Sequence, residues 1–251
     1  MKVYLCEDSF EGILSGVCRA LSQESSLAEL RLEILGTKDA ELFCQYEEVP
    51  VSSEAADSLS EKICRRISAF AWKRIYIASL SLDPERAQWI FRFICDGLHY
   101  GKRITEMLHL ESVYALFRMC RFVENESHLL SGFLRFGETK EGVLMAVMAP
   151  KNDVLPLLAD HFSNRMPEEN WLIYDKGRRK AALHQMKTGW FILRQADLQE
   201  NDQISWNTDQ EEYQELWRIF HQSAAIRERE NFRCQRTHLP LRYRPYMTEF
   251  S

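Results

Sequence analysis

Seven ionisable side chains lie among apolar residues in one stretch of this sequence. They are Glu126, His128, Arg135, His161, Arg165, Asp175 and Arg178. Burying an unpaired charge is costly, so ionisable groups inside helices and strands must be paired or used in a site. A carboxylate beside a histidine can move protons, so Glu126, His128, His161 and Asp175 are the candidate catalytic residues. The arginines Arg135, Arg165 and Arg178 are candidates for binding phosphate.

Each candidate also has a structural interpretation. His128 lies near the end of an expected helix, where a histidine can simply cap the last carbonyl groups. His161 and Arg165 are four residues apart and therefore share one helix face, which we expect to meet Asp175 in a cleft. Asp175 ends an expected strand, where a carboxylate often binds backbone amides of the following turn. Both interpretations stay open for all of these residues.

A second group of arginines lies near the C-terminus. Residues 226–246 hold six arginines and two glutamates, interleaved with Phe232, Tyr243 and Tyr246. Guanidinium groups and aromatic rings are what nucleic-acid phosphates and bases engage. We therefore predict contacts to DNA from Arg229, Arg233, Arg236, Arg242 and Arg244. The alternative is a solvated tail that pairs with residues 1–60, which carry 12 acids and 4 bases.

Composition excludes several classes of protein. The seven cysteines are scattered singly, so we expect no structural zinc, and we predict no metal and no cofactor. Two histidines with Glu126 or Asp175 could form a metal triad, but nothing in their spacing requires it. There is no glycine-rich phosphate loop and no G-x-S-x-G motif. No apolar run approaches the roughly 20 residues of a membrane span, and the start is unlike a signal peptide, so we expect a cytoplasmic protein.

Hydrophobic periodicity predicts an α+β fold. A strand at 2–6 precedes a helix at 9–22 that Asp8 or Ser9 would cap, and short strands are possible at 31–35 and 48–52. Three helices are expected next, at 55–73, from Asp83 to Gly101, and at 111–127. The first half is therefore an N-terminal β-α unit with a helical assembly.

The second half predicts an antiparallel sheet layer with packed helices and an arginine-rich tail. The expected elements are a hairpin at 132–137 and 142–149, a helix at 153–165 capped by Asn152, strands at 170–175, 180–184 and 189–195, and a last helix at 209–229. We place a boundary after residue 130, with regions 1–130 and 131–251, although the chain could form one continuous domain.

The chain resembles an uncharacterised bacterial family. The resemblance is carried first by the pattern of Glu126, His128, Gly132, Phe133, Arg135 and Phe136, then by Pro150, Leu157, Leu158, His161, Phe162, Arg165, Trp171, Tyr174, Asp175 and Arg178. It continues through Trp217, Phe220, Ile226, Arg229, Asn231, Gln235, Pro240, Arg242, Tyr243 and Glu249. Members contain a domain of unknown function and are described as DNA repair or DNA metabolism proteins.

The resemblance implies a partner as well. It implies that members of the family occur in genomes together with a radical SAM protein, and that some relatives are fused to a domain like uracil-DNA glycosylase. Leu129 stands where many members have an arginine, so no basic role is transferred to that position. No catalytic residue is transferred either.

These observations favour a DNA-metabolism protein that binds nucleic acid or a nucleotide and acts with a radical SAM partner. One alternative is a non-catalytic scaffold for that partner, in which the charged residues are internal supports. Another is a base-acting hydrolase or glycosylase in which Asp175 or Glu126 activates water.

Overall fold

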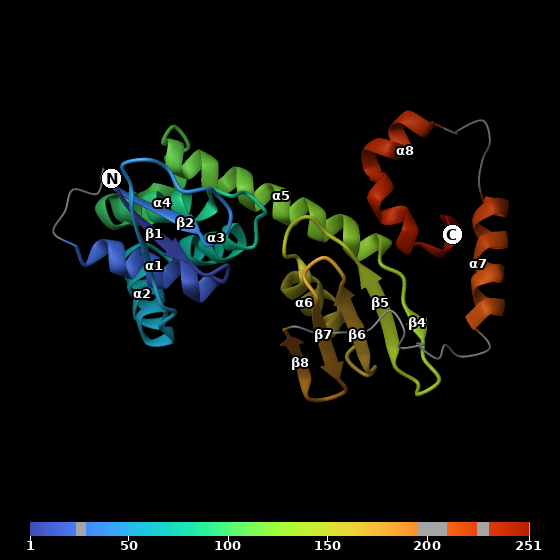
Figure 1. Ribbon diagram of the computed structural model, residues 1–251. Helices are drawn as coiled ribbons and strands as arrows, with labels where there is room; N and C mark the ends of the chain where they lie inside the picture. The colour runs from blue at the N-terminus through green and yellow to red at the C-terminus, as the bar shows by residue number, and fades with distance from the viewer. Residues whose placement is uncertain (24–28, 195–209, 225–230, 251) are drawn as a thin grey trace. The chain divides into compact units, whose positions relative to one another are not determined.

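A computed structural model describes residues 1–23, 29–194, 210–224 and 231–250 of the chain (Figure 1). The chain divides into two compact units, Met1–Glu124 and Asn125–Ser251, and each is described by itself. Among the described helices, none is long and apolar enough to cross a membrane. The α+β class is confirmed, since helices accompany a sheet in each unit.

The first unit contains a parallel three-stranded sheet in the order β2-β1-β3. The strands are β1 (Lys2–Cys6), β2 (Leu30–Ile34) and β3 (Gln45–Glu48). Helix α1 (Phe10–Leu21) follows β1, and the Ser9 hydroxyl caps it by accepting a hydrogen bond from the Gly12 amide. Gly16 allows α1 to approach the strand, because a Cβ atom there would lie 2.2 Å from the Cys6 Sγ.

Helices complete this unit, and one prediction about them is wrong. The expected helix at 55–73 is two helices, α2 (Ser53–Arg66) and α3 (Ala69–Ser79). The break occurs because the Ser68 hydroxyl caps α3 by accepting from the Ala71 amide. The unit continues with α4 (Arg86–Tyr100), the 3-10 helix η2 (Gly101–Glu106) and the first part of α5 (Glu111–Phe133).

Helix α5 is longer than expected and replaces part of a predicted strand. It ends at Phe133, so the strand expected from residue 132 is reduced to β4 (Gly137–Glu138). Leu130 and Leu134 are both buried and four residues apart, and the Leu134 amide donates to the Leu130 carbonyl at 2.9 Å. The buried residues of this segment therefore follow the helical period, although its apolar and polar residues also alternate as in a strand.

The second unit contains a five-stranded sheet in the order β4-β5-β6-β7-β8. The other strands are β5 (Leu144–Met148), β6 (Trp171–Asp175), β7 (Lys180–Gln185) and β8 (Gly189–Leu193). The sheet is mixed rather than antiparallel throughout, because β5 and β6 are parallel neighbours. They are joined by α6 (Leu155–Arg165), which makes the β-α-β unit that the sequence interpretation had rejected.

The C-terminal part consists of short helices. Helix α7 (Gln210–Ala224) lies within the predicted helix at 209–229, whose first residue and last five residues lie outside the described residues. It is followed by α8 (Phe232–His238), η4 (Leu241–Tyr246) and η5 (Thr248–Phe250). Tyr243 and Met247 are each 2% exposed and fix this segment in the second unit.

Candidate functional site

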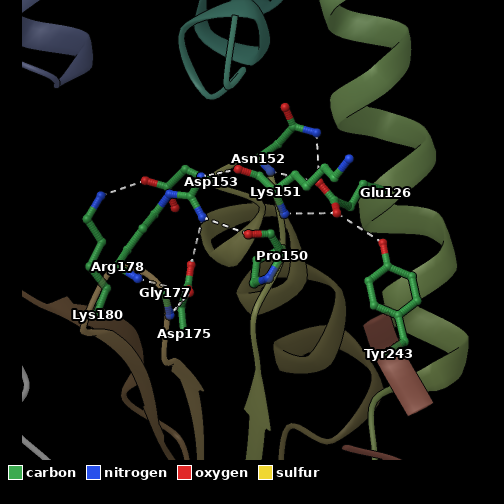
Figure 2. A network of polar contacts seen from close by, with 10 residues as sticks. All are labelled: Glu126, Pro150, Lys151, Asn152, Asp153, Asp175, Gly177, Arg178, Lys180 and Tyr243. Atoms are coloured by element: carbon green, nitrogen blue, oxygen red, sulfur yellow. Dashed lines mark hydrogen bonds and ion pairs between the residues drawn. The ribbon is translucent and has the colours of Figure 1, made fainter. Parts of the chain in front are cut away.

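Glu126 is the centre of a buried hydrogen-bond network in the second unit (Figure 2). Its Oε1 accepts from the Lys151 amide at 3.0 Å, from Arg242 Nη2 at 2.8 Å and from the Tyr243 hydroxyl at 3.0 Å. Its Oε2 accepts from the Asn152 amide and from Asn152 Nδ2, each at 2.7 Å. One carboxylate therefore ties α5 to the β5–α6 loop and to η4.

These donors set the ionisation of the network. Burial alone would raise the pKa of Glu126, but the hydrogen bonds from the Asn152 and Lys151 amides and from Arg242 lower it below the usual value. The same surroundings act oppositely on the phenol, since burial and the nearby Glu126 carboxylate raise the pKa of Tyr243 to about 12. Tyr243 thus remains a neutral donor while Glu126 remains an anion.

Asp175 forms a second network at the carboxyl end of β6. Its side chain is 0% exposed, and its Oδ1 accepts from the amides of Gly177 at 2.9 Å and Arg178 at 3.2 Å. Its Oδ2 accepts from Arg178 Nη1 at 3.2 Å. Burial raises the pKa of Asp175, although the Arg178 guanidinium opposes that shift. The turn interpretation of Asp175 accounts for Oδ1, and the Arg178 guanidinium accounts for Oδ2.

The two networks meet at the loop of residues 150–153, which we call the clamped loop (Figure 2). On one side Glu126 holds its Lys151 and Asn152 amides. On the other side Arg178 donates to the carbonyls of Pro150, at 3.2 Å, and Lys151. Lys180 Nζ also lies 2.6 Å from an Asp153 carboxylate oxygen. The loop follows β5, whose carboxyl end adjoins that of its parallel neighbour β6.

Asn152 does not cap α6 as the sequence predicted. The residue before α6 is Val154, which offers no side-chain cap, and a proline occupies the first turn. The Asn152 side chain donates to Glu126 instead. A buried carboxylate with open acceptor sites is a stronger partner for an amide than a helix end that begins with proline.

Arg135 belongs to a third contact in the same unit. Its guanidinium lies 2.7 Å from a Glu249 carboxylate oxygen and 5.7 Å from the ring centre of Trp217. The Trp217 indole also donates to Glu249, at 3.2 Å. Arg135 therefore connects the end of α5 to α7 and η5, and its charge is neutralised within the protein.

The remaining predicted residues divide into two sets. His128, His161 and Arg165 are exposed on their helices, and no contact in the described part of the chain joins them to Glu126 or Asp175. The cleft predicted to be shared by His161, Arg165 and Asp175 is thus not supported by any described contact. Arg233 and Arg236 are exposed on α8, Arg244 donates to Gln235, and Arg229 lies outside the described residues.

The arrangement limits what these carboxylates can do. Glu126 accepts five hydrogen bonds and is 4% exposed, and Asp175 accepts three and is 0% exposed, so neither carboxylate is open to an attacking water. Within residues 1–23, 29–194, 210–224 and 231–250, no three His, Cys, Asp or Glu side chains are grouped to hold a metal. The networks of Glu126 and Asp175 therefore act as supports for the clamped loop.

Sequence reasoning missed several members of the networks. Tyr243 was interpreted only as an aromatic group near arginines, and Asn152 only as a cap. Glu249 and Trp217 were noted without a role, although they neutralise and cover Arg135. The available signal was the position of Glu126 and Asp175 among apolar residues, since each buried carboxylate requires a partner.

A separate cavity of about 350 Å³ lies in the first unit. Its lining includes Leu30, Phe91, Cys95, Asp96, Leu110 and Ser112. The Ser112 hydroxyl donates to Asp96, and burial raises the pKa of Cys95 to about 11, so this thiol is not an activated nucleophile. None of the predicted site residues lines the cavity.

Comparison with known proteins identifies the family. A family model described as a domain of unknown function, DUF4130, matches residues 84–249. The chain belongs to this family. The DUF4130 match contains α4 to η5, and thus all three contacts built on Glu126, Asp175 and Arg135. No curated protein matches the chain. The expected domain of unknown function is confirmed, while the DNA-repair role and the radical SAM partner stay predictions.

Proposed function

We propose that this DUF4130 protein binds nucleic acid through the exposed arginines of α8. The observation that carries the proposal is the exposure of the Arg233 and Arg236 side chains and how they are paired. Both side chains are exposed, and the described interactions give neither of them an acidic partner. Residues 231–248 contain four arginines and no acidic residue, and Glu249, which follows them, pairs with Arg135.

Other predicted arginines are already used inside the protein. Arg135 pairs with Glu249, Arg178 with Asp175, and Arg242 with Glu126. Internal pairing satisfies a guanidinium and removes its net charge, which makes it a poor phosphate ligand. The proposal therefore concentrates on Arg233 and Arg236 rather than on the whole arginine-rich segment.

Salt dependence tests the proposal directly. The double variant Arg233→Ala/Arg236→Ala should weaken binding to labelled DNA and flatten the plot of log affinity against log salt. Each lost phosphate contact should reduce the slope by about 0.7–0.9. The matched control is Arg65→Ala/Arg66→Ala, which removes two exposed arginines from the end of α2 in the other unit. It should leave affinity and slope close to those of the parent protein.

Two results would contradict the proposal. One is that the parent protein fails to bind DNA or RNA even at low salt. The other is that both double variants behave alike, because loss of positive charge anywhere would then explain the change. Circular dichroism of each variant confirms that exposed substitutions have left the fold intact.

The finer role proposed here is DNA metabolism together with a radical SAM partner, in the cytoplasm. Its support is the sequence resemblance, and all seven cysteines are free, which suits a reducing compartment. Co-purification of a tagged chain with the neighbouring radical SAM protein tests the partnership. Failure of the two proteins to associate at physiological salt would remove this part of the proposal.

A scaffold for that partner is the second candidate. It is favoured by the burial of Glu126 and Asp175 and by their hydrogen bonds within the protein, which suit structural support better than water activation. A scaffold would bind the radical SAM protein but leave Arg233 and Arg236 without effect on nucleic acid. The salt series separates the two candidates.

A further inference from the structure

We propose that the nucleic acid is single-stranded and that its bases stack on exposed aromatic rings beside the α8 arginines. This inference rests on the proposed nucleic-acid binding. Phe232 is 67% exposed at the start of α8 and is followed immediately by Arg233. Arg236 is four residues from Phe232, so the ring and this guanidinium lie on the same face of the helix.

A second helix adds aromatic rings to the same part of the unit. On α7, Phe220 is 60% and Trp217 is 40% exposed, and their ring centres are 5.8 Å apart. Helix α7 is attached to η5 by Trp217 and by Arg218 Nε, which donates to the Thr248 carbonyl at 3.3 Å. Helix α8 is attached to η4 by Arg244 Nη2, which donates to Gln235 at 3.1 Å. Both aromatic helices are thus held by residues 241–250.

An exposed aromatic ring beside arginines favours single-stranded over double-stranded nucleic acid. A duplex hides its base faces, so a protein that holds only duplex phosphates gains nothing from an exposed phenylalanine beside arginines. Unpaired bases present flat faces that stack on aromatic rings, while arginines hold the backbone between them. A protein surface would also cover apolar rings, but a partner for this segment would need to supply anions at close intervals. Single-stranded nucleic acid supplies both features in one repeat.

The test compares the affinities for single-stranded and duplex nucleic acid and then removes the Phe232 ring. Anisotropy titrations compare a labelled single-stranded oligonucleotide with its duplex, using the full-length protein. The single strand should bind more tightly, and Phe232→Ala should weaken its binding about 5- to 100-fold while duplex binding stays unchanged. The salt slope should not change, since no charge is removed. Phe232→Leu keeps an apolar side chain without a ring and should lose nearly as much affinity.

Phe191→Ala is the matched control. Phe191 is 51% exposed on β8 in the same unit, away from the arginines in sequence, and its loss should leave both affinities unchanged. Phe220→Ala should reduce single-strand affinity further when combined with Phe232→Ala. Melting temperatures of all variants should match the parent, because the substituted rings are exposed.

The possible failures are distinguishable. Equal binding of single strand and duplex, with no effect of Phe232→Ala, overturns the inference but leaves the arginine proposal standing. Full affinity of Phe232→Leu also overturns it, because the contact would then be apolar packing, as in a protein partner. No salt-dependent binding to any nucleic acid contradicts the proposed function itself.

Discussion

Glu126 and Asp175 show how the pKa values of two buried carboxylates shift in opposite directions. Glu126 is surrounded by donors, which lower its pKa despite burial. Asp175 is more deeply buried and has one partly exposed arginine, so burial raises its pKa. A raised carboxylate pKa is often a sign of a catalytic acid. Here burial raises the pKa, while the Arg178 amide and guanidinium oppose the shift, and the hydrogen bonds from the Gly177 and Arg178 amides give the carboxylate a structural role.

The structural role of Asp175 predicts a graded series of variants. Asp175→Ala removes the acceptor of two turn amides and strands the Arg178 guanidinium, which should cost about 2–4 kcal/mol of unfolding free energy. Asp175→Asn keeps an acceptor oxygen for the amides and should cost clearly less. His128→Ala removes an exposed side chain and should change stability by about 0.5 kcal/mol at most. Urea denaturation of the three variants measures the series, and equal stability of all three would contradict the structural role.

Among the secondary-structure elements, the clamped loop shows what sequence could and could not predict. The runs at 170–175 and 180–184 were predicted as strands, and β6 and β7 lie where expected. The parallel pairing of β5 with β6 was missed, because it depends on how α6 returns the chain rather than on local pattern. The location of a charged cluster was predictable from buried ionisable residues. Its partners were not, since Tyr243 is 117 residues from Glu126.

The hydrogen bonds to Glu126 also predict how the stability of the folded protein changes at acid pH. Glu126→Gln leaves one acceptor oxygen and places an amide donor either against the two donors of Asn152 or against those of Lys151, Arg242 and Tyr243. The folded-state pKa of Glu126 is lowered, so its stabilisation is present above the usual glutamate pKa of about 4.3 and is lost as pH falls through the folded-state value. The raised pKa of Asp175 acts in the opposite direction over this range.

Unfolding midpoints of the Glu126→Gln variant test this. The variant should be less stable than the parent at pH 7 by on the order of 3 kcal/mol. The difference should shrink as the pH falls below about 4, because the parent loses the carboxylate interactions that the variant never had. Tyr243→Phe removes one of the donors that lower the pKa of Glu126 without changing the charge, so its smaller loss should shrink over the same pH range. A constant gap for Glu126→Gln across the range would refute the argument.

At the level of the whole molecule, net charge limits any nucleic-acid interface. The chain carries 37 acids and 32 Lys and Arg residues, for a net charge of −5, and residues 1–60 alone hold 12 of the acids and 4 of the bases. A polyanion is therefore repelled by residues 1–60, and residues 231–248 are an acid-free segment that contains Arg233 and Arg236. Arg242 is committed to Glu126, and Arg244 to Gln235 and the Phe250 ring. Few phosphates can therefore be neutralised at once.

This limit predicts a shallow salt dependence. With two to four phosphate contacts to a single strand, the slope of log affinity against log salt should lie between about −1.4 and −2.8. A broad basic surface would give a much steeper slope, and an acidic protein without an arginine site would give no binding. Anisotropy titrations between low and physiological salt measure it, and Glu249→Gln provides a further check. That change frees Arg135 from its ion pair, so the slope should steepen by roughly one contact if Arg135 lies within reach of the bound strand. A parent slope steeper than about −4 would mean that the contacts extend well beyond α8 and that the proposed interface is too small.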